Sequence, residues 1–216
     1  MTLSKVIIIG SHFPILLTAV YAAFCYRRLD RELRLFSLFV FFSAIVQGIS
    51  LLLWFRSINN LPLLHVYTAL GFMLLALFYR ELLRNFIDKR IIEAAALLFL
   101  LFSIANTLFL QPLSTFNSYA LSAESVLVVI LSLFTYMLLL DNTVKEQRRA
   151  QISSLHWINS GLFVYYSSNL IIFYFGDLIT HSFPKDLNRY TWILHSFFSV
   201  VMYICFFTGL WKRPKR

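Results

Sequence analysis

The stretch NSYALSAESVLVVILSLFTYMLLL, residues 117–140, decides the fold. Its apolar run is long enough to cross a bilayer, because a transmembrane helix needs about 20 mostly apolar residues. Glu124, near the start of the run, is the exception, since a carboxylate in hydrocarbon is costly and commonly belongs to a site. The stretch therefore predicts a membrane helix and marks Glu124 as a candidate functional residue.

The composition of the whole chain indicates the same class. Of its 216 residues, 59% are hydrophobic and 13% are charged, whereas soluble domains carry about 25% charged residues. An all-α integral membrane protein is therefore predicted. The net charge of +9 does not indicate a nucleic-acid partner, because the basic residues lie between apolar runs. Cys25 and Cys205 both lie near cytoplasmic ends of predicted helices, so no stabilising disulfide is expected.

Seven apolar runs of spanning length follow one another along the chain. They cover residues 6–26, 35–55, 61–80, 91–111, 118–140, 153–175 and 190–211. Short polar or charged segments separate the runs, and no linker or soluble domain remains between them. The prediction is one seven-transmembrane-helix bundle that covers residues 1–216.

The basic residues predict the orientation of this bundle, because cytoplasmic loops of membrane proteins are enriched in Lys and Arg. Fifteen of the 19 basic residues fall on one side: Arg27, Arg28, Arg31, Arg34, Arg80, Arg84, Lys89, Arg90, Lys145, Arg148, Arg149, Lys212, Arg213, Lys215 and Arg216. The other side holds Lys5, Arg56, Lys185 and Arg189. We therefore expect the N-terminus outside and the C-terminus in the cytoplasm. A cleaved signal peptide is the less favoured alternative for the first run, because its positive charges follow the apolar core.

Polar side chains recur at one depth of the predicted bundle. Glu124 lies about six residues, or about 9 Å, below the outer boundary. The other helices offer polar residues at a similar depth: Ser11, His12, Gln47, Ser50, His65, Tyr67, Asn106, Thr107, Ser167, Ser168, Asn169, His195, Ser196 and Ser199. Polar groups in lipid are favourable only when they are paired or wetted, so these should face inward. The prediction is a polar cavity at, or just beneath, the outer surface.

The same residues also have a simpler interpretation, as side chains that join helices by hydrogen bonds worth about 0.6–2 kcal/mol each. For the serines, the threonines and Asn106 this interpretation is preferred. Glu124 and His195 are ionisable and lie deeper, so a site is preferred for these two. Gln47, His65, Tyr67 and Asn169 are expected to help them bind a ligand.

Zinc is the cofactor of an alternative hypothesis, because it takes histidine and carboxylate ligands. Its ligands here would be His12, His65, His195 and Glu124. Two ligands one helical turn apart are typical of such sites, and neither HxxxH nor HExxH occurs in the chain. Under the preferred hypothesis no cofactor is predicted. Retinal is excluded, since the last run holds no lysine before Lys212.

Several segments resemble one family. LHWINSGLFVYYSSNLIIFYF, NLPLLHVYTALGFMLLALFY, SAESVLVVI and WILHSFFSVVMYICFFTGLWK are similar to the sixth, third, fifth and seventh helices of small seven-transmembrane-helix integral membrane proteins of Bacteroidota type. The resemblance covers most of the chain. It implies a companion of sensor histidine kinases and therefore a sensory role. Glu124 and His195 match the pattern of that family.

These observations together favour a multi-pass sensor or receptor-like protein of the bacterial inner membrane. A small-molecule ligand or a lipid headgroup would bind in the outer polar cavity, and a signalling partner protein would receive the response. The alternative is a membrane-embedded zinc enzyme such as a lipid hydrolase. A third hypothesis is a structural or assembly subunit. Enzymatic activity is the less favoured expectation, because no catalytic motif occurs.

Overall fold

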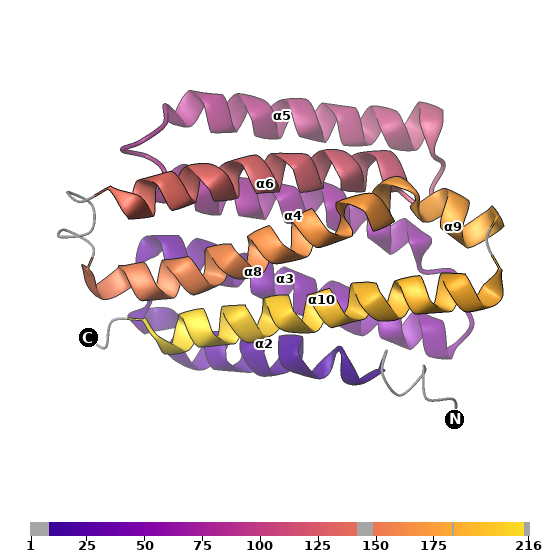
Figure 1. Cartoon of the computed structure of the whole chain (residues 1–216), viewed down its shortest axis with the longest axis horizontal. Coiled ribbons are helices and arrows are strands. Elements are labelled where there is room, and N and C mark those ends of the chain that lie inside the picture. The colour runs from indigo at the N-terminus through magenta and orange to yellow at the C-terminus, as the bar shows by residue number, and fades with distance from the viewer. Residues whose placement is uncertain (1–8, 142–148, 183, 214–216) are drawn as a thin grey trace.

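The structure, a computed structural model, describes residues 9–141, 149–182 and 184–213. Its long helices run side by side and alternate in direction (Figure 1). In chain order they are α2 (Phe13–Cys25), α3 (Arg31–Phe55), α4 (Leu61–Leu82), α5 (Lys89–Ala105), α6 (Ser118–Leu140), α8 (Arg149–Tyr174) and α10 (Lys185–Trp211). Three short elements join them: η1 (Tyr26–Arg28), the π-helical η2 (Asn106–Leu110) that continues α5, and α9 (Gly176–Ser182). The predicted all-α class is confirmed.

Five helices in the described part of the chain are long and apolar enough to cross a membrane. They are Arg31–Phe55, Lys89–Leu110, Leu61–Leu82, Ser118–Leu140 and Asp186–Trp211. The helix α2 has 13 residues, which is too few to span hydrocarbon by itself. The helix α8 carries Asn159 and Asn169 among its apolar residues, which lowers its hydropathy. The fold is therefore a helical bundle that contains helices long and apolar enough to cross a membrane.

The predicted run 118–140 coincides with α6 at both ends. The first run, 6–26, differs from the structure, because α2 begins only at Phe13 and residues 11 and 12 form a turn. Pro14 explains this start: a proline has no N–H to donate and is tolerated in the first turn of a helix. Residues 1–8 of that run lie outside the described residues.

Apolar side chains divide between an aromatic core and a large exposed surface. In the core, the ring of Phe36 lies 4.8 Å from that of Phe206 and 5.4 Å from that of Phe78, between centroids. At the surface, Phe24 and Phe109 are 85% and 81% exposed. Soluble proteins rarely expose apolar side chains on this scale. A hydrocarbon environment accounts for the exposed surface.

The helices α8 and α10 approach each other closely at two glycines. A Cβ atom on Gly161 would lie 2.8 Å from Cys205 Cβ and 3.0 Å from the Met202 carbonyl oxygen. A Cβ atom on Gly209 would lie 2.9 Å from the Ser154 carbonyl oxygen. Small residues permit such approach between membrane helices, where packing provides much of the association energy.

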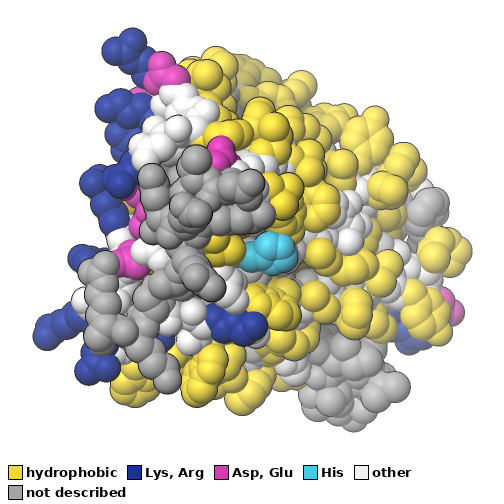
Figure 2. Space-filling view, turned by 60° about the vertical axis from the view of Figure 1, so that its left-hand side comes forward, with side chains coloured by type: hydrophobic (Ala, Val, Ile, Leu, Met, Phe, Trp, Pro, Cys, Tyr) yellow, Lys and Arg dark blue, Asp and Glu magenta, His cyan; other side chains and the backbone are white. Residues whose placement is uncertain are grey.

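Basic side chains gather at one end of the bundle, along the left-hand edge of Figure 2. We call this end, which includes η1 and the turn of residues 83–88, the basic end. The opposite end includes the turns of residues 56–60 and 111–117. Among the described residues, the structure thus keeps the more basic loops and the less basic loops at opposite ends of the bundle.

Candidate functional site

Glu124 is buried inside the bundle, at 1% exposure. Glu124 lies in the second turn of α6 and follows the small residues Ser118, Ala120, Ser122 and Ala123. It belongs to the buried face of α6, which packs against α4 and α8. The Tyr166 hydroxyl of α8 donates a hydrogen bond to Glu124 Oε1 at 3.0 Å. The carboxyl group is therefore held by a neutral donor, in surroundings where an isolated negative charge would be costly.

A second set of hydroxyl groups lies beside this carboxyl group. The hydroxyls of Ser43 and Tyr67 are 3.2 Å apart, and Gln47 Nε2 donates to the Tyr203 hydroxyl at 2.8 Å. The Tyr203 hydroxyl also bonds with those of Ser43 and Tyr67, and a Cβ atom on Gly71 would lie 3.9 Å from the Tyr67 ring and 4.0 Å from Glu124 Oε1, so these two side chains are close neighbours. The structure thus links α3, α4 and α10 to Glu124 by polar side chains.

His195 lies in an aromatic box that joins the same set. Its Nδ1 donates to Asn169 Oδ1 at 2.9 Å, and its ring centroid lies 5.7 Å from that of Tyr165, 5.6 Å from that of Phe173 and 5.8 Å from that of Trp192. Tyr165 in turn contacts Tyr166 edge-on, with centroids 5.1 Å apart. We call the connected residues the Glu124 cluster; it comprises Ser43, Gln47, Tyr67, Glu124, Tyr165, Tyr166, Asn169, His195 and Tyr203.

His65, the other residue predicted to help bind a ligand, lies in a different arrangement. It is 3% exposed, with Nδ1 2.9 Å from Thr107 Oγ1 and Nε2 3.1 Å from the Thr115 carbonyl oxygen. Both ring nitrogens are therefore used to fasten α4 to the connection between α5 and α6. The predicted depth of His65 could not show whether the side chain joins helices or belongs to the Glu124 cluster.

The connection between α5 and α6 contains polar residues that the sequence did not single out. Gln111 Nε2 donates to Ser118 Oγ at 2.8 Å, and Asn106 Nδ2 donates to Asn117 Oδ1 at 2.8 Å. Gln111 Oε1 also accepts from the Tyr119 backbone N–H at 3.0 Å. Asn106 was predicted to join helices, and in the structure it does so at the chain reversal.

The ligands proposed for zinc are not brought together. No three His, Cys, Asp or Glu residues of the described part of the chain lie where they could share a metal ion. His65 uses both nitrogens at the α5–α6 connection, and His12 is half-buried before α2. The geometry therefore adds no support to a centre of His12, His65, His195 and Glu124.

Four members of the Glu124 cluster were not predicted as site residues: Ser43, Tyr165, Tyr166 and Tyr203. A signal for Tyr203 does exist, because it follows His195 by eight residues, and steps of four keep residues on one helical face. It lies in an otherwise apolar segment, VVMYICFFTGL. From the sequence alone, a single tyrosine in this segment cannot be told from the other aromatic residues. The structure identifies it by placing Gln47 opposite its hydroxyl.

The half of the bundle nearer the basic end has its own buried polar contacts. The Tyr79 hydroxyl lies 2.9 Å from Ser132 Oγ and donates to Asn159 Oδ1 at 3.3 Å, and Asn159 Nδ2 donates to the Ser132 carbonyl oxygen at 3.0 Å. These three residues join α4, α6 and α8. Polar contacts are therefore not confined to the predicted layer.

The fold and these contacts define a class, a helical-bundle protein with membrane-spanning helices and a buried polar cluster. No family model, curated protein or solved structure matches the chain. The function must therefore be argued from the Glu124 cluster and from the distribution of charge.

Proposed function

We propose that the chain is a receptor-like sensor of the bacterial inner membrane that crosses the membrane seven times. The basic end would face the cytoplasm, with the N-terminus outside, because Lys and Arg concentrate on cytoplasmic loops. The gathering of basic side chains in Figure 2 supports this orientation. With 26 residues, α8 would be long enough to cross the membrane.

The observation that carries the sensor proposal is the surroundings of Glu124. The salt bridges found among the described residues lie elsewhere and do not include it. A carboxyl group buried at this depth without a paired cation costs stability, and such residues in membrane proteins commonly mark functional sites. A small polar ligand or a lipid headgroup would add a second polar partner beside the Tyr166 hydroxyl.

The connections of the cluster suggest how binding would be transmitted. Its members come from α3, α4, α6, α8 and α10, so a change at Glu124 would alter the packing of five helices together. All five continue to the basic end. There the loops would engage a cytoplasmic signalling partner, because they are too short to carry an activity of their own.

Ligand-induced thermal shifts test the proposal. The purified chain in nanodiscs would be screened against headgroup analogues (glycerol phosphate, phosphoethanolamine, phosphocholine) and small amines. A compound that raises the Tm of the wild type should lose at least tenfold in apparent affinity with Glu124→Gln or His195→Ala. Ser167→Ala is the control, because Ser167 is exposed and bonds only within α8. Unchanged shifts in both cluster variants would reject the site.

A structural or assembly subunit is the second candidate, and the pairing of polar groups with one another favours it. Gln47, Asn169 and His65 all have protein partners. This hypothesis predicts that cluster substitutions lower the Tm while no compound in the screen shifts it. The same experiment therefore separates the two candidates.

A further inference from the structure

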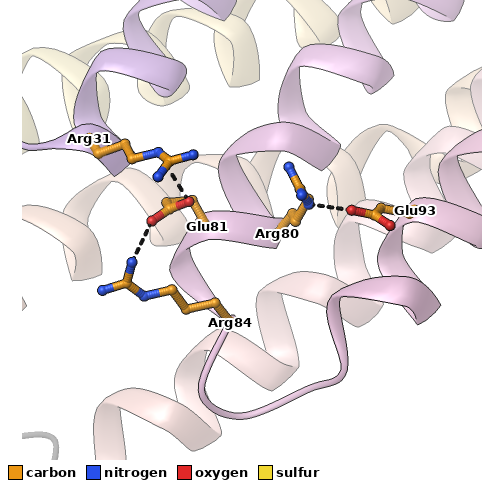
Figure 3. A network of polar contacts seen from close by, with 5 residues as sticks. All are labelled: Arg31, Arg80, Glu81, Arg84 and Glu93. Atoms are coloured by element: carbon orange, nitrogen blue, oxygen red, sulfur yellow. Dashed lines mark hydrogen bonds and ion pairs between the residues drawn. The ribbon is translucent and has the colours of Figure 1, made fainter.

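A cluster of charged side chains at the basic end joins α3 to the end of α4 (Figure 3). Arg31 Nε lies 3.3 Å from Glu81 Oε2, and Arg84 Nη1 donates to Glu81 Oε1 at 2.8 Å. The side chains of Arg31 and Arg84 are 71% and 53% exposed, whereas that of Glu81 is 10% exposed. One buried carboxylate thus positions two exposed guanidinium groups.

A pocket of about 290 Å³ adjoins this cluster, lined by Asp30, Arg31, Glu32, Glu81, Arg84 and Gln151. The acidic groups lie toward its interior: Glu32 is 8% exposed, and Asp30 accepts a hydrogen bond from Gln151. The guanidinium groups form the exposed rim. Guanidinium groups held in place by carboxylates are well suited to bind a phosphate group through paired N–H donors.

Two exposed aliphatic stripes lead away from the two arginines along neighbouring helices. Leu38 and Ile45 follow Arg31 along α3 at intervals of seven residues and are 38% and 61% exposed. Leu77 and Leu70 precede Arg84 at the same interval and are 40% and 46% exposed. Seven residues make almost two helical turns, so each stripe lies on nearly the same face as its arginine.

Each of these stripes is long enough to cross one leaflet of a membrane. Fourteen residues of helix rise about 21 Å, whereas half of the hydrocarbon core is about 15 Å thick. The helices α3 and α4 pack against each other, and Arg31 and Arg84 both contact Glu81, so the two stripes begin side by side. A phosphate-binding rim therefore sits at the end of two apolar tracks that are long enough for acyl chains.

We propose that this surface binds an anionic phospholipid, with its phosphate on Arg31 and Arg84 and its acyl chains along Leu38–Ile45 and Leu70–Leu77. The inference rests on the membrane placement proposed above, and it is independent of the ligand site at Glu124. The two segments that contribute the arginines, residues 27–34 and 80–90, contain eight basic and four acidic residues, and this surplus favours a headgroup of net negative charge over a zwitterionic one. Bound lipid would join α3 to α4 at the basic end.

A charge-matched pair of variants tests this inference. The triple variant Arg31→Gln, Glu81→Gln, Arg84→Gln removes the cluster and lowers the net charge by one, and Arg90→Gln lowers it by one at an exposed position of α5. The Tm of each delipidated protein would be measured with dioleoyl phosphatidylglycerol, with dioleoyl phosphatidylcholine and with inorganic phosphate. Phosphatidylglycerol should raise the Tm of the wild type and of Arg90→Gln. It should bind the triple variant at least tenfold more weakly.

Three results would overturn the inference: an equal shift in the triple variant, an equal shift with phosphatidylcholine, or a shift that inorganic phosphate reproduces. If the triple variant does not fold, native mass spectrometry of the wild type decides, since equal retention of the two lipids also rejects the site. Glu124→Gln should keep the full phosphatidylglycerol shift. Failure at the Glu124 cluster is thereby distinguished from failure of this site.

Discussion

At the scale of single residues, two histidines of similar predicted depth have different surroundings. His195 contacts Tyr165, Phe173 and Trp192 and bonds to Asn169. His65 bonds across to Thr107 and to the backbone of Thr115. Both are histidines of the predicted polar layer, and His195 was predicted to lie the deeper of the two. The difference lies in the segment that the fold places opposite each ring. It makes His195 part of the Glu124 cluster, whereas His65 joins α4 to the connection between α5 and α6.

Replacing His65 should therefore affect stability and not ligand response. With His65→Leu, the Thr115 carbonyl oxygen loses its donor, and an unsatisfied buried polar group costs about 1–3 kcal/mol. The Tm in detergent should fall, while any ligand-induced shift of the wild type persists. His156→Ala, at an exposed position, is the control and should change neither quantity. A lost ligand response without a fall in Tm would return His65 to the site.

The buried contact of Tyr79 gives a second prediction at this scale. Tyr79→Phe removes the hydroxyl that bonds to Ser132 and Asn159. Hydrogen bonds between membrane helices average about 0.6 kcal/mol and reach about 1.7 kcal/mol, so we expect a loss of about 1 kcal/mol. Unfolding in a denaturing detergent would measure it against Tyr119→Phe, whose ring is 50% exposed. Equal stabilities of the two variants would show that this contact contributes nothing.

At the scale of helices, glycines inside the apolar helices differ in how closely a neighbouring helix approaches them. Gly161 lies against Cys205 and Met202, whereas a Cβ on Gly48 would meet nothing within 4 Å and one on Gly71 would meet Phe39 at an ordinary 3.7 Å. The contact between α8 and α10 is close at Gly161 and again at Gly209.

Alanine substitution at Gly161 and Gly48 should consequently have opposite effects. Gly161→Ala pushes against a Cβ and a backbone oxygen, neither of which can rotate away, so overpacking should cost about 1–3 kcal/mol. Gly48→Ala meets open space and gains helix propensity, worth up to about 1 kcal/mol. Thermal unfolding of both variants measures the difference. A neutral Gly161→Ala would mean that α8 and α10 can separate without loss.

At the scale of the whole molecule, the arrangement of charge and apolar surface relates the bundle to its membrane. The exposed apolar belt lies between two ends of different charge (Figure 2). The short turns at residues 56–60 and 111–117 are opposite the basic end. A bundle of this kind would insert with its basic end toward the cytoplasm.

Cysteine labelling tests this orientation. In a background with Cys25 and Cys205 replaced by alanine, Asn59→Cys and Arg90→Cys place single exposed thiols at opposite ends. A membrane-impermeant maleimide should label Asn59→Cys on intact spheroplasts. It should label Arg90→Cys only after the membrane is permeabilised. The reverse pattern would invert the topology, and labelling of both before permeabilisation would reject the membrane placement.

Much of the fold could be predicted from the sequence because helix length and apolar continuity are local properties. The run 118–140, for example, coincides with α6 at both ends. The first helix was less well predicted, since Pro14 moves its start to Phe13. Of the six residues predicted to bind a ligand, the structure brings Glu124, His195, Gln47, Tyr67 and Asn169 into one cluster and leaves His65 outside it.

The sequence by itself determined that the chain forms apolar helices of spanning length with its basic residues on alternate loops, because composition and period are carried by neighbouring residues. The tertiary structure alone decided which polar side chains face one another. Tyr166 reaches Glu124 from 42 positions away, Gln47 and Tyr203 are separated by 156 positions, and the pairing of Glu81 with Arg31 joins two helices. Such pairings depend on how helices pack and rotate, and no local pattern records that.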